Sequence, residues 1–303
     1  MKVILAQLMV VFLLITITTN KSFSQSINLD ESTGCMVSEV RGKVTYTEKG
    51  SKTAKTVSAG TVLPEDATVT VANKASFSLA CDDRSLPFRT KGTYQMAALA
   101  KDVQAKGEQS RFAKMAFAAK GYGTTPPDTT KVRKGWGDKD SLLFIIPIGG
   151  KVPLQPTKFS WTPLKAGSIY KLIVYENAKD APVLSATTSG ASFNFDPAQL
   201  AVKTGKLYHV QVMLANDGKT ASKVVNISFV SPNEGVTALE PLMKDKEYIG
   251  SNAVKKSLME AMELESRQLN SLASERYQKA ISLDAKNTLA KQMYVAFLDR
   301  VSK

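Results

Sequence analysis

Two cysteines are the side chains of this sequence with the most distinctive chemistry. Cys35 and Cys81 form either one disulfide or two separate buried thiols. A bond is favoured in an exported protein, because compartments outside the cytoplasm are oxidising. Cys35 begins the first expected strand and Cys81 ends a later one, so adjacent strands would bring the thiols together. Closing a loop of about 45 residues stabilises a fold by roughly 3–4 kcal/mol in the chain-entropy model.

His209 is the only histidine, and this limits catalytic and metal chemistry. A multi-histidine metal site is excluded, and a serine or cysteine triad is disfavoured. An acid-pair glycosidase remains formally open, but the carboxylates lie in expected turns, such as Asp82 and Asp83, or on helix faces. No glycine-rich phosphate loop occurs. The sequence therefore predicts a non-catalytic protein without a metal or a cofactor.

Basic side chains are a third group with functional potential, because the formal net charge is +13. Basic residues of the helix expected over 97–120 and of the linker after it, together with Trp136, are the candidate contacts for an anionic partner: Lys101, Arg111, Lys114, Arg133 and Lys134. Trp136 stands between two glycines and is either an exposed binding anchor or a contact to a neighbouring domain. The alternative to anion binding is that scattered lysines only keep the protein soluble.

The first 24 residues have the organisation of a secretory signal peptide. Lys2 supplies the positive charge, the apolar stretch is densest over residues 8–15, and small residues stand at Ser22 and Ser24. A retained anchor is the less favoured alternative, because the unbroken apolar run falls far short of the roughly 20 residues of a spanning helix. We predict cleavage after Ser24, a mature chain without a transmembrane span, and a periplasmic or secreted location.

Export changes the partners that a basic chain is expected to meet. In the cytoplasm this charge would favour nucleic acid. Outside it, the anionic partners are envelope polymers, lipid headgroups and acidic proteins. Nucleic acid is therefore not an expected partner, whereas other envelope proteins are.

The elements that must position these side chains begin with a β-domain at residues 34–96. Short segments rich in Val, Thr, Tyr and Phe alternate with turn residues, as in an all-β sandwich or barrel. Glycines and alternating apolar residues in this stretch resemble the FecR-type periplasmic β-domain: Gly42, Val44, Gly60, Leu63, Asp66, Val69, Val71, Ala75, Phe77 and Leu79. FecR proteins transmit a signal through a membrane span and a cytoplasmic anti-sigma segment. We expect neither here, so the resemblance implies the domain without the regulatory activity.

One helix is predicted over residues 97–120, followed by a linker over 121–140. Eight alanines favour the helix and Gly107 weakens its middle. Phe112, Met115 and Phe117 are expected to dock on the β-domain, while basic residues form a stripe that is either a polymer site or a solvated face. The next segment is rich in glycine, proline and threonine, which is typical of a linker.

Residues 141–232 are predicted to form a second β-domain with two facing sheets. The segments FSWTPLKAGSIYKLIVYE and GKLYHVQV resemble a fibronectin type III or immunoglobulin-like sandwich. The resemblance implies that Trp161 fills the core and that Tyr208 closes a corner. His209 alternates out of phase with the apolar residues and is expected to be exposed.

Residues 233–303 change to a helical period. A short helix is predicted over 237–249 and three more follow, the last capped by Asn287. The segment SLASERYQKAISLDAKN resembles the second helix of a tetratricopeptide repeat, with Ala273, Tyr277 and Ala280 at the family spacing. Repeat arrays need about three units to stand alone, so this tail is expected to pack on the sandwich or on a partner. The alternative is a plain helical cap.

The predicted fold class is multidomain and mainly β, with an α-helical C-terminal region. These parts favour an exported, non-catalytic envelope protein that acts as a protein-interaction adaptor or a sensory accessory module. The alternative is a binder of anionic or glycan envelope polymers, through the basic helix and the linker. Salt separates the two hypotheses, because binding dominated by charge weakens steeply with ionic strength.

Overall fold

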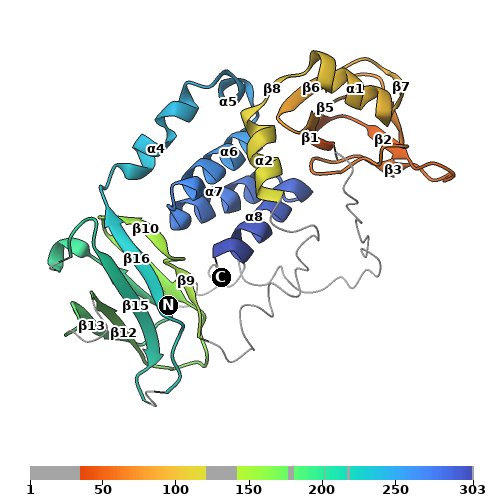
Figure 1. Ribbon diagram of the computed structural model, residues 1–303. Coiled ribbons are helices and arrows are strands. Elements are labelled where there is room, and N and C mark those ends of the chain that lie inside the picture. The colour runs from red at the N-terminus through yellow and green to blue at the C-terminus, as the bar shows by residue number, and fades with distance from the viewer. Residues whose placement is uncertain (1–34, 121–141, 177–180, 201, 217–218, 302–303) are drawn as a thin grey trace, which may run out of the picture.

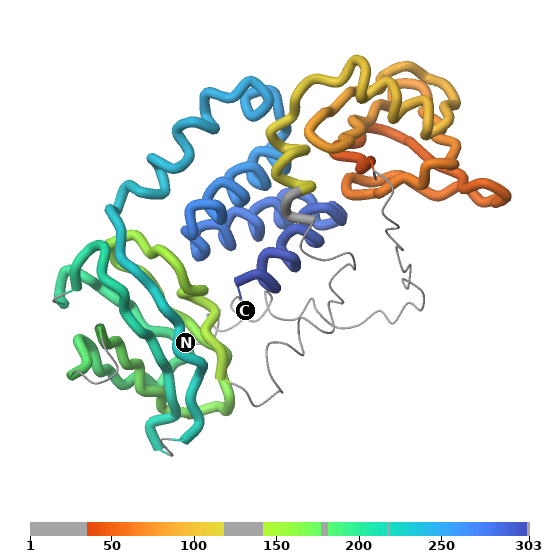
Figure 2. The backbone as a smooth tube through the Cα atoms, viewed as in Figure 1, coloured from red at the N-terminus to blue at the C-terminus, as the bar shows by residue number. Residues whose placement is uncertain are grey.

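The fold is described from a computed structural model, which describes residues 35–120, 142–176, 181–200, 202–216 and 219–301. The predicted signal peptide and the predicted linker over 121–140 lie outside these ranges. Helices from the C-terminal region lie between two β-rich parts of the chain (Figures 1 and 2). The structure is mixed, with antiparallel sheets and C-terminal helices, so the coarse prediction of β-sheets followed by a helical C-terminal region is confirmed.

The first β-rich part, which we call the β-module, contains two four-stranded antiparallel sheets with the orders β1-β5-β6-β8 and β3-β2-β4-β7. Alternating apolar residues such as Val69 and Val71 face a shared core, which helix α1 covers. The elements are β1 (Met36–Arg41), β2 (Val44–Thr47), β3 (Lys55–Thr56), β4 (Thr68–Val71), β5 (Ser76–Cys81), β6 (Arg84–Phe88), β7 (Gly92–Gln95), α1 (Met96–Lys106) and β8 (Glu108–Gln109).

The predicted disulfide is present. Cys35 and Cys81 are bonded, and their Cα atoms are 4.4 Å apart. The bond is possible because β1 and β5 are antiparallel neighbours, with Met36 opposite Ala80. Both cysteines are buried in the core of the β-module, so the bond ties the start of the described chain to its fifth strand.

The prediction of one helix over residues 97–120 is wrong. The structure has two helices, α1 and α2 (Arg111–Lys120), separated by the short strand β8. Gly107 ends α1 with extended backbone, and a Cβ atom there would lie 2.3 Å from the carbonyl oxygen of Val103. Ser110 then caps α2, because its hydroxyl accepts a hydrogen bond of 2.9 Å from the backbone N–H of Ala113. The glycine therefore ends the helix instead of only weakening it.

The second β-rich part, the sandwich, pairs a five-stranded sheet of order β10-β16-β15-β12-β13 with a three-stranded sheet of order β14-β11-β9. Neighbouring strands are antiparallel except for β10 and β16, which are parallel. The strands are β9 (Phe144–Ile146), β10 (Gly150–Pro153), β11 (Thr157–Trp161), β12 (Tyr170–Tyr175), β13 (Leu184–Thr188), β14 (Ser192–Phe195), β15 (Leu207–Leu214) and β16 (Val225–Val230).

Two aromatic residues of the sandwich have the places that the sequence predicts. Trp161 is fully buried between the sheets. Tyr208 is buried at the start of β15, and its hydroxyl accepts a 2.8 Å hydrogen bond from the backbone N–H of Lys203. This bond ties the strand to the loop before it.

The helical region contains α4 (Glu234–Met243), α5 (Lys246–Gly250), α6 (Ala253–Ser266), α7 (Asn270–Leu283) and α8 (Thr288–Val301). The single helix predicted over 237–249 is instead α4 and α5. Asp245 separates them, because its carboxylate accepts hydrogen bonds from the N–H groups of Glu247 and Tyr248 and so begins a new helix. Asn287 caps α8 as predicted, accepting from Ala290 N at 2.9 Å.

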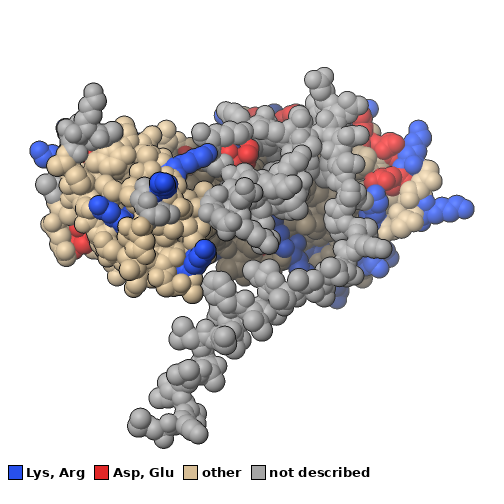
Figure 3. Space-filling model, turned by 90° about the horizontal axis from the view of Figure 1, so that it is seen from below, with Lys and Arg blue, Asp and Glu red and all other residues tan. Residues whose placement is uncertain are grey.

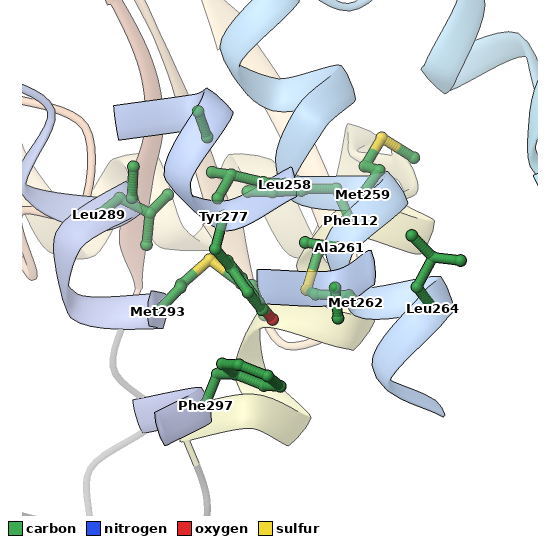
Figure 4. Close-up of a cluster of buried hydrophobic side chains, with 14 of the residues drawn as sticks. Phe112, Leu258, Met259, Ala261, Met262, Leu264, Tyr277, Leu289, Met293 and Phe297 are labelled. Carbon is green, nitrogen blue, oxygen red and sulfur yellow. The ribbon is translucent and has the colours of Figure 1, made fainter. Parts of the chain in front are cut away.

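Helix α2 shares its core mainly with the C-terminal helices, although Met36 of the β-module also belongs to this core. Phe112 and Ala116 are buried in the same cluster as Met259, Tyr277 and Phe297. Figure 4 shows Phe112 near Leu258 and Met259, with Met293 and Phe297 of α8 lower in the view. Phe112, Met115 and Phe117 therefore pack mainly on the C-terminal helices, and their contact with the β-domain is limited to this shared cluster. We call α2 and α4–α8 together the helical unit.

Candidate functional site

The helical unit contacts both β-rich parts, and these two junctions are the candidate functional site. Met36 of β1 belongs to the buried core of the helical unit, and Val230 of β16 packs against it from the other side. Both junctions also contain a glycine with positive φ at a point of close backbone approach. The chain is thus held at two places that are distant in sequence.

The junction with the β-module is built around Gly60. Its φ is +88°, and a Cβ atom there would lie 2.8 Å from the Cα atom of Leu289 in α8. Beside it, the backbone oxygen of Ala59 accepts hydrogen bonds from the Thr288 hydroxyl at 2.6 Å and from Leu289 N at 3.2 Å. Only a residue without a side chain allows this approach. Gly60, which the sequence analysis placed in a turn of the β-domain, therefore also allows the β-module to approach α8 closely.

The N-terminus of α2 is held by Glu247 of α5. The Glu247 carboxylate accepts hydrogen bonds from the Ser110 hydroxyl at 2.7 Å and from Phe112 N at 3.1 Å. Lys255, which is 9% exposed, lies 3.0 Å from the same carboxylate and 5.0 Å from the centre of the Phe112 ring. A carboxylate at a helix N-terminus is favoured by the helix dipole. These contacts fix α2 against the C-terminal helices.

The described members of the predicted basic site, Lys101, Arg111 and Lys114, lie on two separate helices. Arg111 forms an ion pair with Glu263 of α6 at 2.6 Å, so it links two helices within the helical unit. Lys101 lies on α1 and Lys114 on α2, both exposed but on separate helices. Arg133, Lys134 and Trp136 lie outside the described residues. The continuous basic helix that would hold an anionic polymer is therefore not found.

The junction with the sandwich is built around Gly150. Its φ is +82°, and a Cβ atom there would lie 2.4 Å from the backbone oxygen of Gln268. That oxygen accepts a 2.7 Å hydrogen bond from Lys151 N, and the Asn270 side chain donates to the oxygen of Gly149 at 3.3 Å. Gln268 itself has a φ of 62° in the loop between α6 and α7. The loop thus pairs with the first residues of β10.

Two partly buried tyrosine–glutamate hydrogen bonds link helices within the unit. Tyr248 donates to Glu260 at 2.5 Å, and burial together with this bond raises the pKa of Tyr248 to about 12. Tyr277 donates to Glu265 at 2.8 Å, and Arg300 pairs with the same carboxylate at 2.6 Å. Burial raises the pKa of Tyr277 well above its usual value. Both phenols therefore stay protonated donors that cross-link neighbouring helices.

Several residues that hold the helical unit and its junctions together were not identified from the sequence. Glu247 and Glu263 belong to a helical region with many carboxylates, and nothing in their spacing separates them from solvated ones. The sequence does contain a sign of the role of Gly150, because a doubled glycine before an apolar strand indicates a close backbone approach.

The described ranges contain neither a cluster of three His, Cys, Asp or Glu side chains that could hold a metal ion nor a helix with the length and apolarity needed to cross a membrane. No family model matches the chain, and no curated protein sequence matches it.

Proposed function

We propose that this protein is an exported, non-catalytic adaptor of the cell envelope, which holds two β-rich parts at a fixed separation and presents them to other envelope proteins. The observation that carries the proposal is the pair of junctions around Gly60 and Gly150. Between domains of one chain, relative motion is the default unless the contact is extensive. Here backbone hydrogen bonds and close approaches join the helical unit to both parts.

The disulfide supports the exported location. Cys35 and Cys81 are bonded within the β-module, and structural disulfides are rare in cytoplasmic proteins because the thiol pool there reduces them. The predicted signal peptide supports the same conclusion. We place the protein in the periplasm or outside the cell on these two grounds.

Three resemblances support the adaptor role. The two sheets of the β-module suit a FecR-like domain, and the buried Trp161 and corner Tyr208 suit a fibronectin- or immunoglobulin-like sandwich. Ala273 and Tyr277 match the spacing of the tetratricopeptide repeat, and both are buried on α7. All three types of module present edges, loops or grooves to partner proteins.

The test compares two valine substitutions at glycines of positive φ. Gly150→Val should break the sandwich junction. Gly167→Val is the matched control, because Gly167 has a φ of +75° and no atoms within 4 Å of its Cβ position. Small-angle scattering should show a broader distribution of interatomic distances for Gly150→Val alone. Affinity purification from crosslinked intact cells should then recover fewer partner proteins with that variant than with the control.

Two results would contradict the proposal. One is an unchanged scattering profile for Gly150→Val, which would mean that the junction does not set the separation. The other is the recovery of no specific protein by the wild-type chain from intact cells, which would remove the adaptor role itself.

A further inference from the structure

The five-stranded sheet of the sandwich has two edges, and one of them is free. Strand β10 forms one edge and is engaged in the junction with the helical unit, where Lys151 N donates to the oxygen of Gln268. Strand β13 forms the opposite edge, and no strand of the described residues pairs beyond it. Figure 1 shows β13 on the side of the sandwich away from the helical unit. An edge strand carries unpaired N–H and C=O groups that form a template for another chain.

The hydrogen-bond pattern of β12 identifies the unpaired groups of β13. Ala215 N donates to the oxygen of Ile169 at 2.9 Å, so the odd-numbered residues of β12 bond to β15 and the even-numbered ones bond to β13. The even-numbered residues of β12 stand opposite the even-numbered residues of β13. Ser185 and Thr187 lie between these, so their N–H and C=O groups point toward the free side. Both residues are exposed.

Strand β13 lacks the features with which natural sheets prevent pairing at an edge, such as charged side chains, proline or a bulge. Its five residues are uncharged, and its register with β12 is unbroken. They belong to a run over 181–195 without any charged side chain, which is the longest such run after residue 24. The edge is therefore open to pairing.

The other edge strands of the described residues are shorter or protected. Strand β1 is longer than β13, but its register shifts between Val37 and Glu39, it carries the charged Glu39 and Arg41, and Val37 N bonds to the oxygen of Thr61. The remaining edge strands, β3, β7, β8, β9, β10 and β14, have four residues or fewer. Strand β13 is thus the longest unprotected edge.

A second copy of β13 fits this edge. When Ala186 lies on a two-fold axis, antiparallel pairing sets Ser185 of one copy opposite Thr187 of the other. These are the residues with free backbone groups, so every free N–H of one strand meets a free C=O of the other. The same register pairs hydroxyl side chains across the strands, which is a favourable cross-strand contact, and leaves only small alanine side chains at the axis.

Charge does not oppose this pairing, although the chain has a net charge of +13. Lys171 is the charged residue of β12 and stands opposite Thr187. Its two copies would be three strand spacings apart, about 14 Å, which exceeds the screening length at physiological ionic strength. On the side of the molecule seen in Figure 3, uncharged residues cover most of the sandwich, at the left, whereas the β-module at the right shows both signs of charge.

We propose that the free edge of β13 binds the same edge of a second copy of this chain, so that the two sandwiches share one continuous sheet. The contact is symmetric and therefore closes as a dimer. Because β10 lies at the far edge of each sheet, the two helical units lie at opposite ends of the dimer. This inference goes beyond the adaptor function and does not depend on it.

The first test removes an edge hydrogen bond. Thr187→Pro deletes an outward N–H, and proline is tolerated at such positions of edge strands. Its control is Thr93→Pro on the edge strand β7: Met96 N donates to the oxygen of Ala67, so the N–H of Thr93 also points away from the neighbouring strand β4.

Circular dichroism first establishes that both purified variants are folded like the wild type. Analytical ultracentrifugation should then show a dimer for the wild type. Thr187→Pro should raise the dissociation constant of the dimer at least about 30-fold, because each copy loses a backbone hydrogen bond of the interface. Thr93→Pro should dissociate as the wild type does.

The second test reads the register and stays informative if proline unfolds the sandwich. In the proposed pairing the two copies of residue 186 form a non-hydrogen-bonded pair, with Cα atoms about 4.5 Å apart, which suits a disulfide. Ala186→Cys should therefore form a linked dimer under mild oxidation. The control is Ser189→Cys, because Ser189 is exposed but would lie about 20 Å from its own copy. Non-reducing electrophoresis compares the two.

Several results would overturn the inference. A monomeric wild type is one, and a dimer that Thr187→Pro leaves as stable as Thr93→Pro does is another. Equal crosslinking of Ala186→Cys and Ser189→Cys would exclude the register, and crosslinking of Ala186→Cys to a different protein in intact cells would replace the second copy as occupant. The adaptor function is judged separately, by the proteins that the whole chain recovers from intact cells.

Discussion

Tyr248 joins α5 to α6 through its hydrogen bond to Glu260, and this bond has a measurable pH dependence. Because the folded state raises the pKa of Tyr248 from 10.0 to about 12, the protonated phenol stabilises the fold fully below pH 10. That contribution is lost as the pH rises from 10 to 12. Urea unfolding across this range should show wild type losing stability relative to Tyr248→Phe.

Other tyrosines and lysines also titrate in alkali, so the difference between the two proteins is the informative quantity. Parallel loss of stability in wild type and Tyr248→Phe from pH 10 to 12 would show that the bond to Glu260 contributes nothing.

The disulfide is the second feature whose effect belongs to the residue scale. Cys35 and Cys81 are 46 positions apart, and cross-linking a loop of that size is expected to stabilise the fold by about 3–4 kcal/mol. Unfolding of wild type by urea, with and without reductant, should show a loss of this size. A variant with both cysteines changed to serine should be insensitive to reductant, and a reductant effect there would refute the assignment.

Helix α2 is the element that depends most on residues distant in sequence. Glu247→Gln removes the negative charge that accepts hydrogen bonds from the Ser110 hydroxyl and Phe112 N and that pairs with Lys255. Hydrogen bonds to charged groups are worth about 1.5–3 kcal/mol each, and Lys255 would remain without its charged neighbour. We expect a loss of about 2–3 kcal/mol by urea unfolding.

The matched control for this change is Glu240→Gln, because Glu240 is exposed on α4. An exposed substitution should alter stability by less than about 0.5 kcal/mol. If the two variants unfolded at the same urea concentration, Glu247 would not be what holds α2 in place.

The elements of this fold follow from local sequence more closely than their contacts do. Period-two alternation predicts β4, β5, β12 and β15, because each strand buries one side on a core. Strand β10 was missed, since Val152 and Pro153 are buried next to each other and its residues do not alternate. The break between α1 and α2 depends on Gly107 and on the capping hydroxyl of Ser110, and eight nearby alanines conceal both.

The candidate site was the harder prediction, for a physical reason. Arg111 has the same appearance in the sequence as Lys101 and Lys114, yet it alone pairs with a glutamate 152 positions away. Helix propensity and periodicity describe one element at a time. The partner of Arg111 is set by how α2 and α6 pack, which no local pattern contains.

At the scale of the whole molecule, the junction at Gly60 predicts how the β-module separates from the helices. Gly60→Val should push α8 away, because a Cβ atom would lie 2.8 Å from Leu289. Gly50→Val is the control, since Gly50 also has positive φ but has open space around its Cβ position. We expect limited proteolysis to release the β-module from the first variant much faster. Equal cleavage of both variants would mean that Gly60 does not secure the junction.

The place of α2 also has a consequence for the order in which the protein matures. Ser110 and its acceptor Glu247 are 137 positions apart, so Phe112 must wait for the last quarter of the polypeptide before it is covered. A truncated product would carry this aromatic side chain uncovered, and uncovered apolar surface invites aggregation and degradation. Helix α2 is therefore fully packed only after the C-terminal helices have been synthesised.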